Sequence, residues 1–168
     1  MAGTKQGKQI STKSNQTRVA VVGMGNVLLK DEGIGVHVAR TLSKAIGSRT
    51  DLAIIDGGTS PDTFMLLENT DKLIIIDAVN GGGSPGSVYR FCPDDITTAE
   101  KCVTSLHQID VLDGLRMMEL SGTKPDSITI IGIEPKEIDW GLELSPELSE
   151  KLPQIIKVVT DELDSRFK

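Results

Sequence analysis

The stretch VAVVGMGNVLLKDEGIG, residues Val19–Gly35, decides the fold class of this chain. A continuous apolar run leads into a Gly-x-Gly turn at Gly23–Gly25, and the turn leads into a segment with helical spacing. A buried strand, a glycine turn and a helix open many nucleotide-binding α/β domains. Here, however, Leu28 stands where the third glycine of G-x-G-x-x-G would be. The carboxylates of Asp31 and Glu32 would also repel a pyrophosphate.

The rest of the chain repeats this alternation of apolar runs and helical patterns. We expect strands at 18–23, 52–58, 72–79, 86–91 and 127–135, and helices at 33–46, 60–69, 108–120 and 145–167. Apolar strands without polar alternation are buried on both faces. The sequence therefore predicts a three-layer α/β/α sandwich, built on a doubly wound, mostly parallel five-stranded sheet. Ser60 and Ser145 are expected to cap their helices. The strand at 86–91 is expected to run antiparallel at an edge, because no helix precedes it.

Length and charge limit the classes of protein to consider. The 168 residues suit a single domain at 18–168, after a polar, basic segment at 1–17 that we expect to be disordered. The net charge is −6, and because residues 1–18 carry +4, the remainder carries −10. Such an acidic body argues against nucleic-acid binding. With two cysteines and no apolar run of roughly 18–20 residues, we expect a cytoplasmic protein that does not insert into membranes. We also expect it to be a monomer, although no residue pattern fixes the oligomeric state.

The carboxyl end of the sheet is the expected place for a ligand. Right-handed crossovers favour the strand order 2-1-3, so that strands 1 and 3 are neighbours where the order reverses. Polar residues and glycines follow these strands: Asn26, Asp31 and Glu32 after the first, Asp56, Gly57 and Gly58 at the end of the second, and Asp77 at the end of the third. We expect Glu32 and Asp77 to meet in one crevice, with Asn26 and the Asp56–Gly58 segment on its flank as a substrate cleft.

His107 precedes the helix at 108–120 and would lie at the same end of the sheet. Glu32, Asp77 and His107 would then form an incomplete shell of oxygen and nitrogen ligands for Zn²⁺, Ni²⁺ or a similar ion. The spacing is weakly specific, and a second interpretation stays open. In it Asp77 is a capping carboxylate, Glu32 a first-turn acid and His107 a surface histidine.

We also make predictions for two neighbouring features, Asp31 and the Gly81–Gly83 run. Asp31 is the better candidate for the N-cap of the helix at 33–46. The run Gly81–Gly83 is either a low rim of the cleft or a plain flexible linker.

Other catalytic classes fit less well, because the chain has no H-E-x-x-H and no D-[ST]-G. A nucleotide-binding domain of Rossmann type remains an alternative.

Five segments together resemble the hydrogenase maturation endopeptidases: GMGNVLLKDEGIGVHVAR, IIDGGTSPD, LIIIDAVNGGGSPGSVYRF, TSLHQIDVLDGL and IIGIEPKEIDWGLELSPEL. The resemblance covers roughly residues 18–165. It implies an enzyme that removes the C-terminal extension of a [NiFe] hydrogenase large-subunit precursor after nickel insertion, in a family usually classed with aspartic-type peptidases.

The resemblance also assigns metal binding to Glu32, Asp77 and His107. Three protein ligands leave positions for the substrate's own ligands, so we expect nickel presented by the substrate and no tightly bound resident cofactor. The catalytic group stays unassigned: Glu32 or Asp77 could activate water, or the ion could polarise the scissile carbonyl. A non-catalytic metal-sensing chaperone of the large subunit is the alternative function.

Overall fold

The described residues form one sheet of five strands in the order β2-β1-β3-β5-β4. The computed structural model describes residues 18–98 and 106–165, except for the side chains of 96–98 and 106–110. The strands are β1 (Val19–Met24), β2 (Leu52–Gly58), β3 (Lys72–Ala78), β4 (Val88–Phe91) and β5 (Ser127–Ile133). The α-helices are α1 (Ile34–Ile46), α2 (Pro93–Thr98), α3 (Leu106–Ser121) and α4 (Pro146–Asp164), and the 3-10 helices are η1 (Lys30–Gly33) and η2 (Pro61–Leu66).

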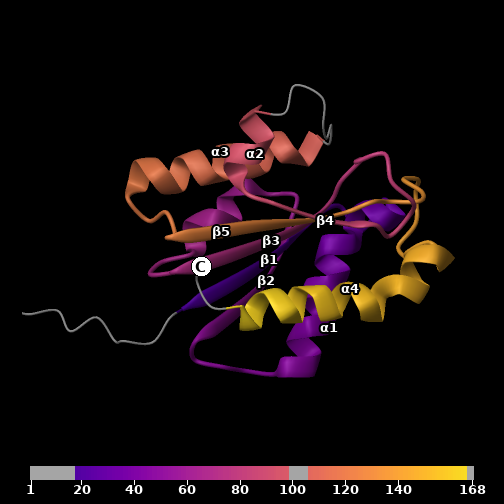
Figure 1. The fold of residues 1–168 in the computed structure, drawn as a ribbon, viewed down its shortest axis with the longest axis horizontal. Coiled ribbons are helices and arrows are strands. Elements are labelled where there is room, and N and C mark those ends of the chain that lie inside the picture. Colours follow the sequence, from indigo (N-terminus) through magenta and orange to yellow (C-terminus); the bar gives the residue numbers. More distant parts are fainter. Residues whose placement is uncertain (1–17, 99–105, 166–168) are drawn as a thin grey trace, which may run out of the picture.

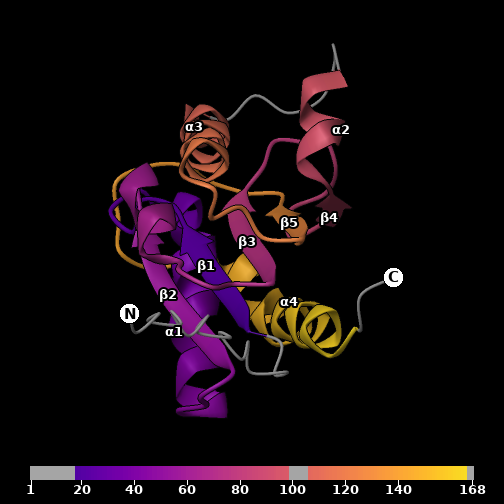
Figure 2. The same cartoon turned by 90° about the vertical axis from the view of Figure 1, so that its left-hand side faces the viewer.

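Helices cover both faces of the sheet, as Figures 1 and 2 show. On one face α1 and α4 pack against the sheet through a cluster that includes Val38, Ile74 and Ile155. On the other face α3 and η2 pack through a second cluster, with Phe64 and Met118 at its centre. All seven residues of β3 are buried, as expected for the middle strand of a sheet with two covered faces.

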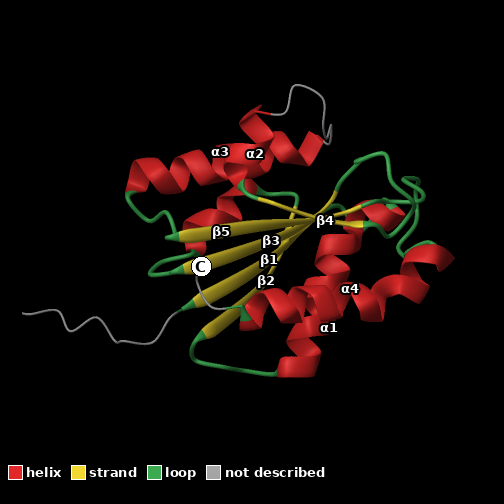
Figure 3. Cartoon of the chain, viewed as in Figure 1, coloured by secondary structure: helices red, strands yellow, loops and turns green. Residues whose placement is uncertain are grey.

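The predicted architecture is confirmed. β1 pairs in parallel with both β2 and β3, β3 pairs in parallel with β5, and β4 pairs antiparallel with β5 at the edge. The loops that follow β3 and β5 therefore extend beyond the same end of the sheet (Figure 3). Strands 1 and 3 are neighbours, which is the reversal of strand order on which the predicted crevice depends.

Of the two predicted serine N-caps, one is confirmed and the other is wrong. Ser145 caps α4, because its Oγ accepts a hydrogen bond from Leu148 N–H at 3.4 Å. The helix expected at 60–69 is instead the 3-10 helix η2, and Ser60 makes no side-chain cap bond. Ser60 followed by a proline is typical of either helix type, and six residues are too few for the helical period to separate them.

None of the helices in the described ranges is both long enough and apolar enough to span a bilayer.

Candidate functional site

Two glycines bring the turn after β1 against the end of β3. Gly25 adopts a φ of +130°, and a Cβ there would collide with the carbonyl of Glu32. A Cβ at Gly35 would collide with the carbonyls of Met24 and Ile76. Only glycine allows the first turn of α1 to pack this closely on the ends of both strands.

This packing places Glu32 and Asp77 at the same end of the sheet. Glu32 lies in η1, three residues before Gly35, and Asp77 follows Ile76, whose carbonyl Gly35 contacts. Asp77 is 2 % exposed and accepts a hydrogen bond from Ala78 N–H at 2.8 Å. Glu32 is half-buried, and one oxygen of each carboxylate, Glu32 Oε2 and Asp77 Oδ2, is shielded from solvent. Two carboxylates thus occupy the point where the strand order reverses.

His107 lies in the first turn of α3, rather than in the loop before it. Its side chain is outside the described residues, so its part in a ligand set stays a prediction. Among the side chains that the structure does describe, no cluster of three His, Cys, Asp or Glu residues suited to a metal ion occurs. The pair of carboxylates is the part of the predicted shell that can be placed.

Asp31 does not cap α1, contrary to the expectation from sequence. The N-cap of α1 is Gly33, and Asp31 is fully buried. Its Oδ2 accepts from the N–H groups of Lys136 and Glu137, both at 2.9 Å, and its Oδ1 accepts from Ser145 N–H at 2.7 Å. Asp31 therefore fastens the segment 134–145, which follows β5, to the turn after β1.

The residues predicted to line the substrate cleft lie around the same end of the sheet. Asn26 Oδ1 accepts from Leu28 N–H at 3.0 Å, which fixes the turn after β1. Gly58 accepts from Gly25 N–H at 2.8 Å, so the end of β2 is joined to that turn. A Cβ at Gly57 would lie 2.6 Å from Met24 Sδ, so a larger residue here would displace the buried Met24 side chain.

Asp56, also predicted to line the cleft, is paired with Arg40 of α1. Arg40 Nε donates to Asp56 Oδ2 at 2.8 Å, and Arg40 Nη2 lies 2.7 Å from the same oxygen. The Asp56 side chain is 38 % exposed. Its place in the predicted substrate cleft stays a prediction.

Glu134 is a residue of this region that the sequence reasoning missed. Its Oε2 accepts from Tyr89 Oη and Gly81 N–H, both at 2.7 Å, and from Gly83 N–H at 3.3 Å. Burial opposes ionisation of Glu134, but these hydrogen bonds outweigh it and hold its pKa below the usual range for a glutamate. The same bond to Glu134 raises the pKa of Tyr89. The available signal was that Glu134 directly follows a buried strand, as Asp77 ends another.

The Gly81–Gly83 run is consequently fixed in place and is not a plain linker. Besides the bonds to Glu134, Gly83 N–H donates to Tyr89 Oη at 3.0 Å. A Cβ at Gly81 would lie 2.5 Å from the Tyr89 ring. The glycines let this loop lie flat on the tyrosine beside the end of β3, which agrees with the interpretation as a low rim.

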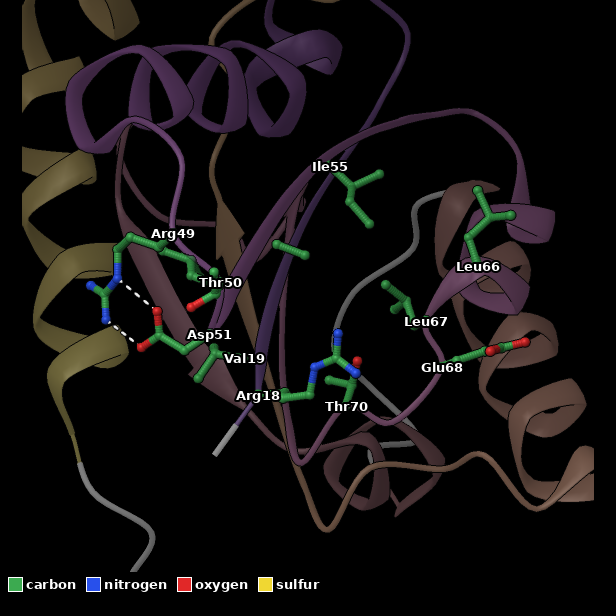
Figure 4. A pocket seen from close by; sticks show the side chains of 12 residues that line it. Arg18, Val19, Arg49, Thr50, Asp51, Ile55, Leu66, Leu67, Glu68 and Thr70 are labelled. Atoms are coloured by element: carbon green, nitrogen blue, oxygen red, sulfur yellow. Dashed lines mark hydrogen bonds and ion pairs between the residues drawn. The ribbon is translucent and has the colours of Figure 1, made fainter. Parts of the chain in front are cut away.

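A pocket of about 270 Å³ lies at the opposite end of the sheet. In Figure 4, Arg49 and Asp51 form an ion pair on one wall at 2.6 Å, and Leu66 and Leu67 stand on the other. The pocket also includes Val19, the first residue of β1. Ligands of open α/β sheets bind at the carboxyl ends of the strands, so this pocket is not the candidate site.

The sequence and the fold match those of known proteins. The family model described as "Hydrogenase maturation protease" matches residues 36–162. The chain belongs to the hydrogenase maturation protease family.

Individual relatives of this family cover most of the chain. The hydrogenase expression/formation protein HupD of Bradyrhizobium diazoefficiens is 32 % identical over 146 residues, which are 84 % of this chain and 75 % of the relative. HupD of Rhodobacter capsulatus is 34 % identical over 152 residues, 87 % of this chain and 71 % of the relative. This protein is therefore a peptidase with a role in hydrogenase processing.

Solved structures of the family have the same fold. The hydrogenase maturating endopeptidase HybD from Escherichia coli superimposes with a TM-score of 0.76 at 29 % identity, over 88 % of this chain and 92 % of that one. The [NiFe] hydrogenase maturation protease HybD from Thermococcus kodakarensis gives a TM-score of 0.75 at 28 % identity, over 89 % and 100 % of the two chains. The fold predicted for the protease from its sequence is thus confirmed independently.

Proposed function

We propose that the protease removes the C-terminal extension of a [NiFe] hydrogenase large-subunit precursor after nickel has been inserted. The observation that carries the proposal is the placement of Glu32 and Asp77 together at the reversal of strand order, in a member of this family. We further propose that it acts as a monomer in the cytoplasm, which size-exclusion chromatography with light scattering and cell fractionation would test.

The proposed metal contact uses the two carboxylates and His107. Carboxylate oxygen and imidazole nitrogen are ligands that Ni²⁺ accepts. If the protease supplies at most three ligands, the cysteines of the precursor can hold the remaining positions. Nickel is then part of the substrate, and its presence signals that the precursor is loaded.

Two routes to peptide hydrolysis fit this arrangement. In the first, Glu32 or Asp77 acts as the general base that activates water, as the classification with aspartic-type peptidases suggests. In the second, the substrate's ion polarises the scissile carbonyl and the carboxylates hold the ion. Both routes require the carboxylates to be ionised and close to the scissile bond.

The test compares nickel-loaded and nickel-free precursor of the cognate large subunit. We expect mass spectrometry to show loss of the extension from the loaded form only. Asp77→Asn and His107→Ala should each lower the cleavage rate about 100-fold or more. Asp126→Asn, an exposed carboxylate before the amino end of β5, is the matched control and should cleave normally.

Three results would contradict the proposal in different ways. Equal cleavage of nickel-free precursor would show that recognition does not depend on nickel. Full activity of His107→Ala would remove this histidine from the site. An unchanged precursor mass in the presence of active, folded protein would favour the metal-sensing chaperone instead.

A further inference from the structure

An exposed apolar surface lies beside the candidate site. In the described part of the chain eight large apolar side chains are exposed, and four of them come from two adjoining segments. These are Leu28 (49 % exposed), Ile138 (50 %), Trp140 (77 %) and Leu142 (65 %), which we call the Trp140 platform. Trp140 is the only tryptophan of the sequence. Apolar groups gathered in this way are typical of interaction surfaces.

The backbone of the platform is fixed, because hydrogen bonds join its two segments. Gly141 N–H donates to the Leu28 carbonyl at 2.9 Å, and Lys30 N–H donates to the Gly141 carbonyl at 2.9 Å. Asp31 N–H donates to the Glu137 carbonyl at 3.2 Å, and the buried Asp31 carboxylate holds the same segment through three further bonds. The exposed side chains therefore stand on a fixed backbone, which lowers the entropic cost of binding a partner.

The platform is continuous with the candidate site through one short turn. Leu28 belongs to the platform, and Glu32 lies four residues further along the same turn. The segment that carries Trp140 follows β5, and β5 ends beside Asp77 and Ala78 of β3. The platform and the two carboxylates therefore lie at the same end of the sheet.

The charges around the platform are mainly negative. Lys30 is neutralised by Glu137 at 2.6 Å, and Lys136 lies 3.9 Å from Glu147. Asp139 and Glu143 form no ion pair with any residue that the structure describes. A complementary partner would therefore present apolar side chains with lysine or arginine next to them.

We propose that the Trp140 platform docks the hydrogenase large-subunit precursor, through an apolar segment with adjacent basic residues near its cleavage site. This inference rests on the proposed function and adds to it the surface that recognises the substrate protein. Trp140 is the central anchor, since a large aromatic side chain exposed on a fixed backbone is the typical hot spot of an interface. Glu32 and Asp77 then need to recognise only the metal and the scissile bond.

The first test separates docking from chemistry with nickel-loaded precursor. We expect Trp140→Ala to raise KM about 10-fold or more, with kcat within about twofold of wild type. Trp140→Phe should restore part of the lost affinity. Leu120→Ala is the matched control: Leu120 is 88 % exposed but lies near the end of α3, at the amino end of the sheet. Its KM should not change.

The second test observes the tryptophan directly. Protein labelled with 5-fluorotryptophan gives one ¹⁹F resonance, because the chain has a single tryptophan. With unlabelled, nickel-loaded precursor in excess, the resonance should shift during turnover and return when the precursor is consumed.

Each outcome of these tests supports or overturns the inference. Unchanged KM for Trp140→Ala, or an unshifted resonance while cleavage proceeds, would overturn the docking role and leave the proposed function intact. A shift that depends on protease concentration without precursor would also overturn it, and would assign the platform to self-association. No cleavage of precursor by wild-type protein would instead contradict the proposed function itself.

Discussion

Adjacent carboxylates in the turn after β1 have opposite environments. Asp31 is fully buried and accepts three backbone N–H groups, whereas Glu32 is only half-buried at the end of the sheet. The side chain of Asp31 faces into the protein because its partners lie there, 105 to 114 residues further along the chain. One member of the pair holds the architecture, and the other remains for the candidate site.

Substitution of each carboxylate should separate stability from activity. Asp31→Ala leaves three backbone N–H groups without their acceptor, so we expect the free energy of unfolding to fall by about 3 kcal/mol or more. Glu32→Ala should change it by less than about 1 kcal/mol while abolishing cleavage. Urea denaturation measures the first effect and precursor cleavage the second. Equal stability of the two variants would show that Asp31 does not anchor segment 134–145.

At this scale the sequence indicated which residues are special but not what they contact. The chain order of Gly25, Asp31 and Glu32 was sufficient to locate the turn and its two carboxylates. It was not sufficient to assign Asp31, because an N-cap is a local role and the observed partners are remote in sequence. The bonds of Glu134 to Gly81 and Tyr89 were missed for the same reason.

Elements were predicted well where the sequence contains long apolar runs. β1, β3 and β5 are continuous apolar runs, and their parallel pairing follows from the helices between them. Segment 134–145 belongs to no strand or helix, so no periodicity could predict it. Its position depends on bonds to Asp31 and to the backbone of the turn, and these form only in the folded protein.

The stability that the Gly81–Gly83 loop gains from Glu134 should depend on pH. The folded-state pKa of Glu134 is depressed, so its ionised form contributes stability above the unfolded-state pKa. That contribution is lost as the pH falls through the folded-state pKa. We therefore expect Glu134→Gln to cost about 1–3 kcal/mol at pH 7. The difference from wild type should shrink on acidification.

Urea denaturation of both proteins from neutral to acidic pH measures this effect. Glu150→Gln is the control, because Glu150 is exposed on α4 and its substitution should matter little at any pH. A difference between wild type and Glu134→Gln that stays constant with pH would mean that Glu134 acts through its shape and not its charge.

Across the whole molecule, the groups that fasten the sheet and the candidate site occupy opposite ends. Lys72 at the start of β3 is 4 % exposed, and its Nζ lies 3.3 Å from Oε1 of Glu162 in α4. Glu162 also accepts from Arg90 Nε of β4 at 2.7 Å. Burial opposes ionisation of Glu162, but these partners hold its pKa below the usual range. One carboxylate thus joins α4 to two strands.

Removal of that carboxylate should lower the stability of the protein without altering catalysis. Glu162→Ala leaves Lys72 buried and charged without this partner, and we expect a loss of about 3–5 kcal/mol in thermal or urea unfolding. Lys157→Ala breaks an exposed pair with Asp161 on the same helix and should cost less than about 1 kcal/mol. Cleavage per folded molecule should be normal in both variants. Reduced kcat in folded Glu162→Ala would show that the two ends are coupled.

The buried position of Asp31 has a consequence for redesign of this fold. Glycines at positions 28 and 32 would make the turn look like a dinucleotide-binding loop, but Asp31 would have to stay. Its charge would then lie close to a bound phosphate, because Asp31 supplies three of the hydrogen bonds that hold segment 134–145. Conversion to a cofactor-binding protein would therefore demand a new way to attach that segment. The glycines give the turn the shape of a phosphate-binding loop, but the buried Asp31 carboxylate makes it unsuited to an anion.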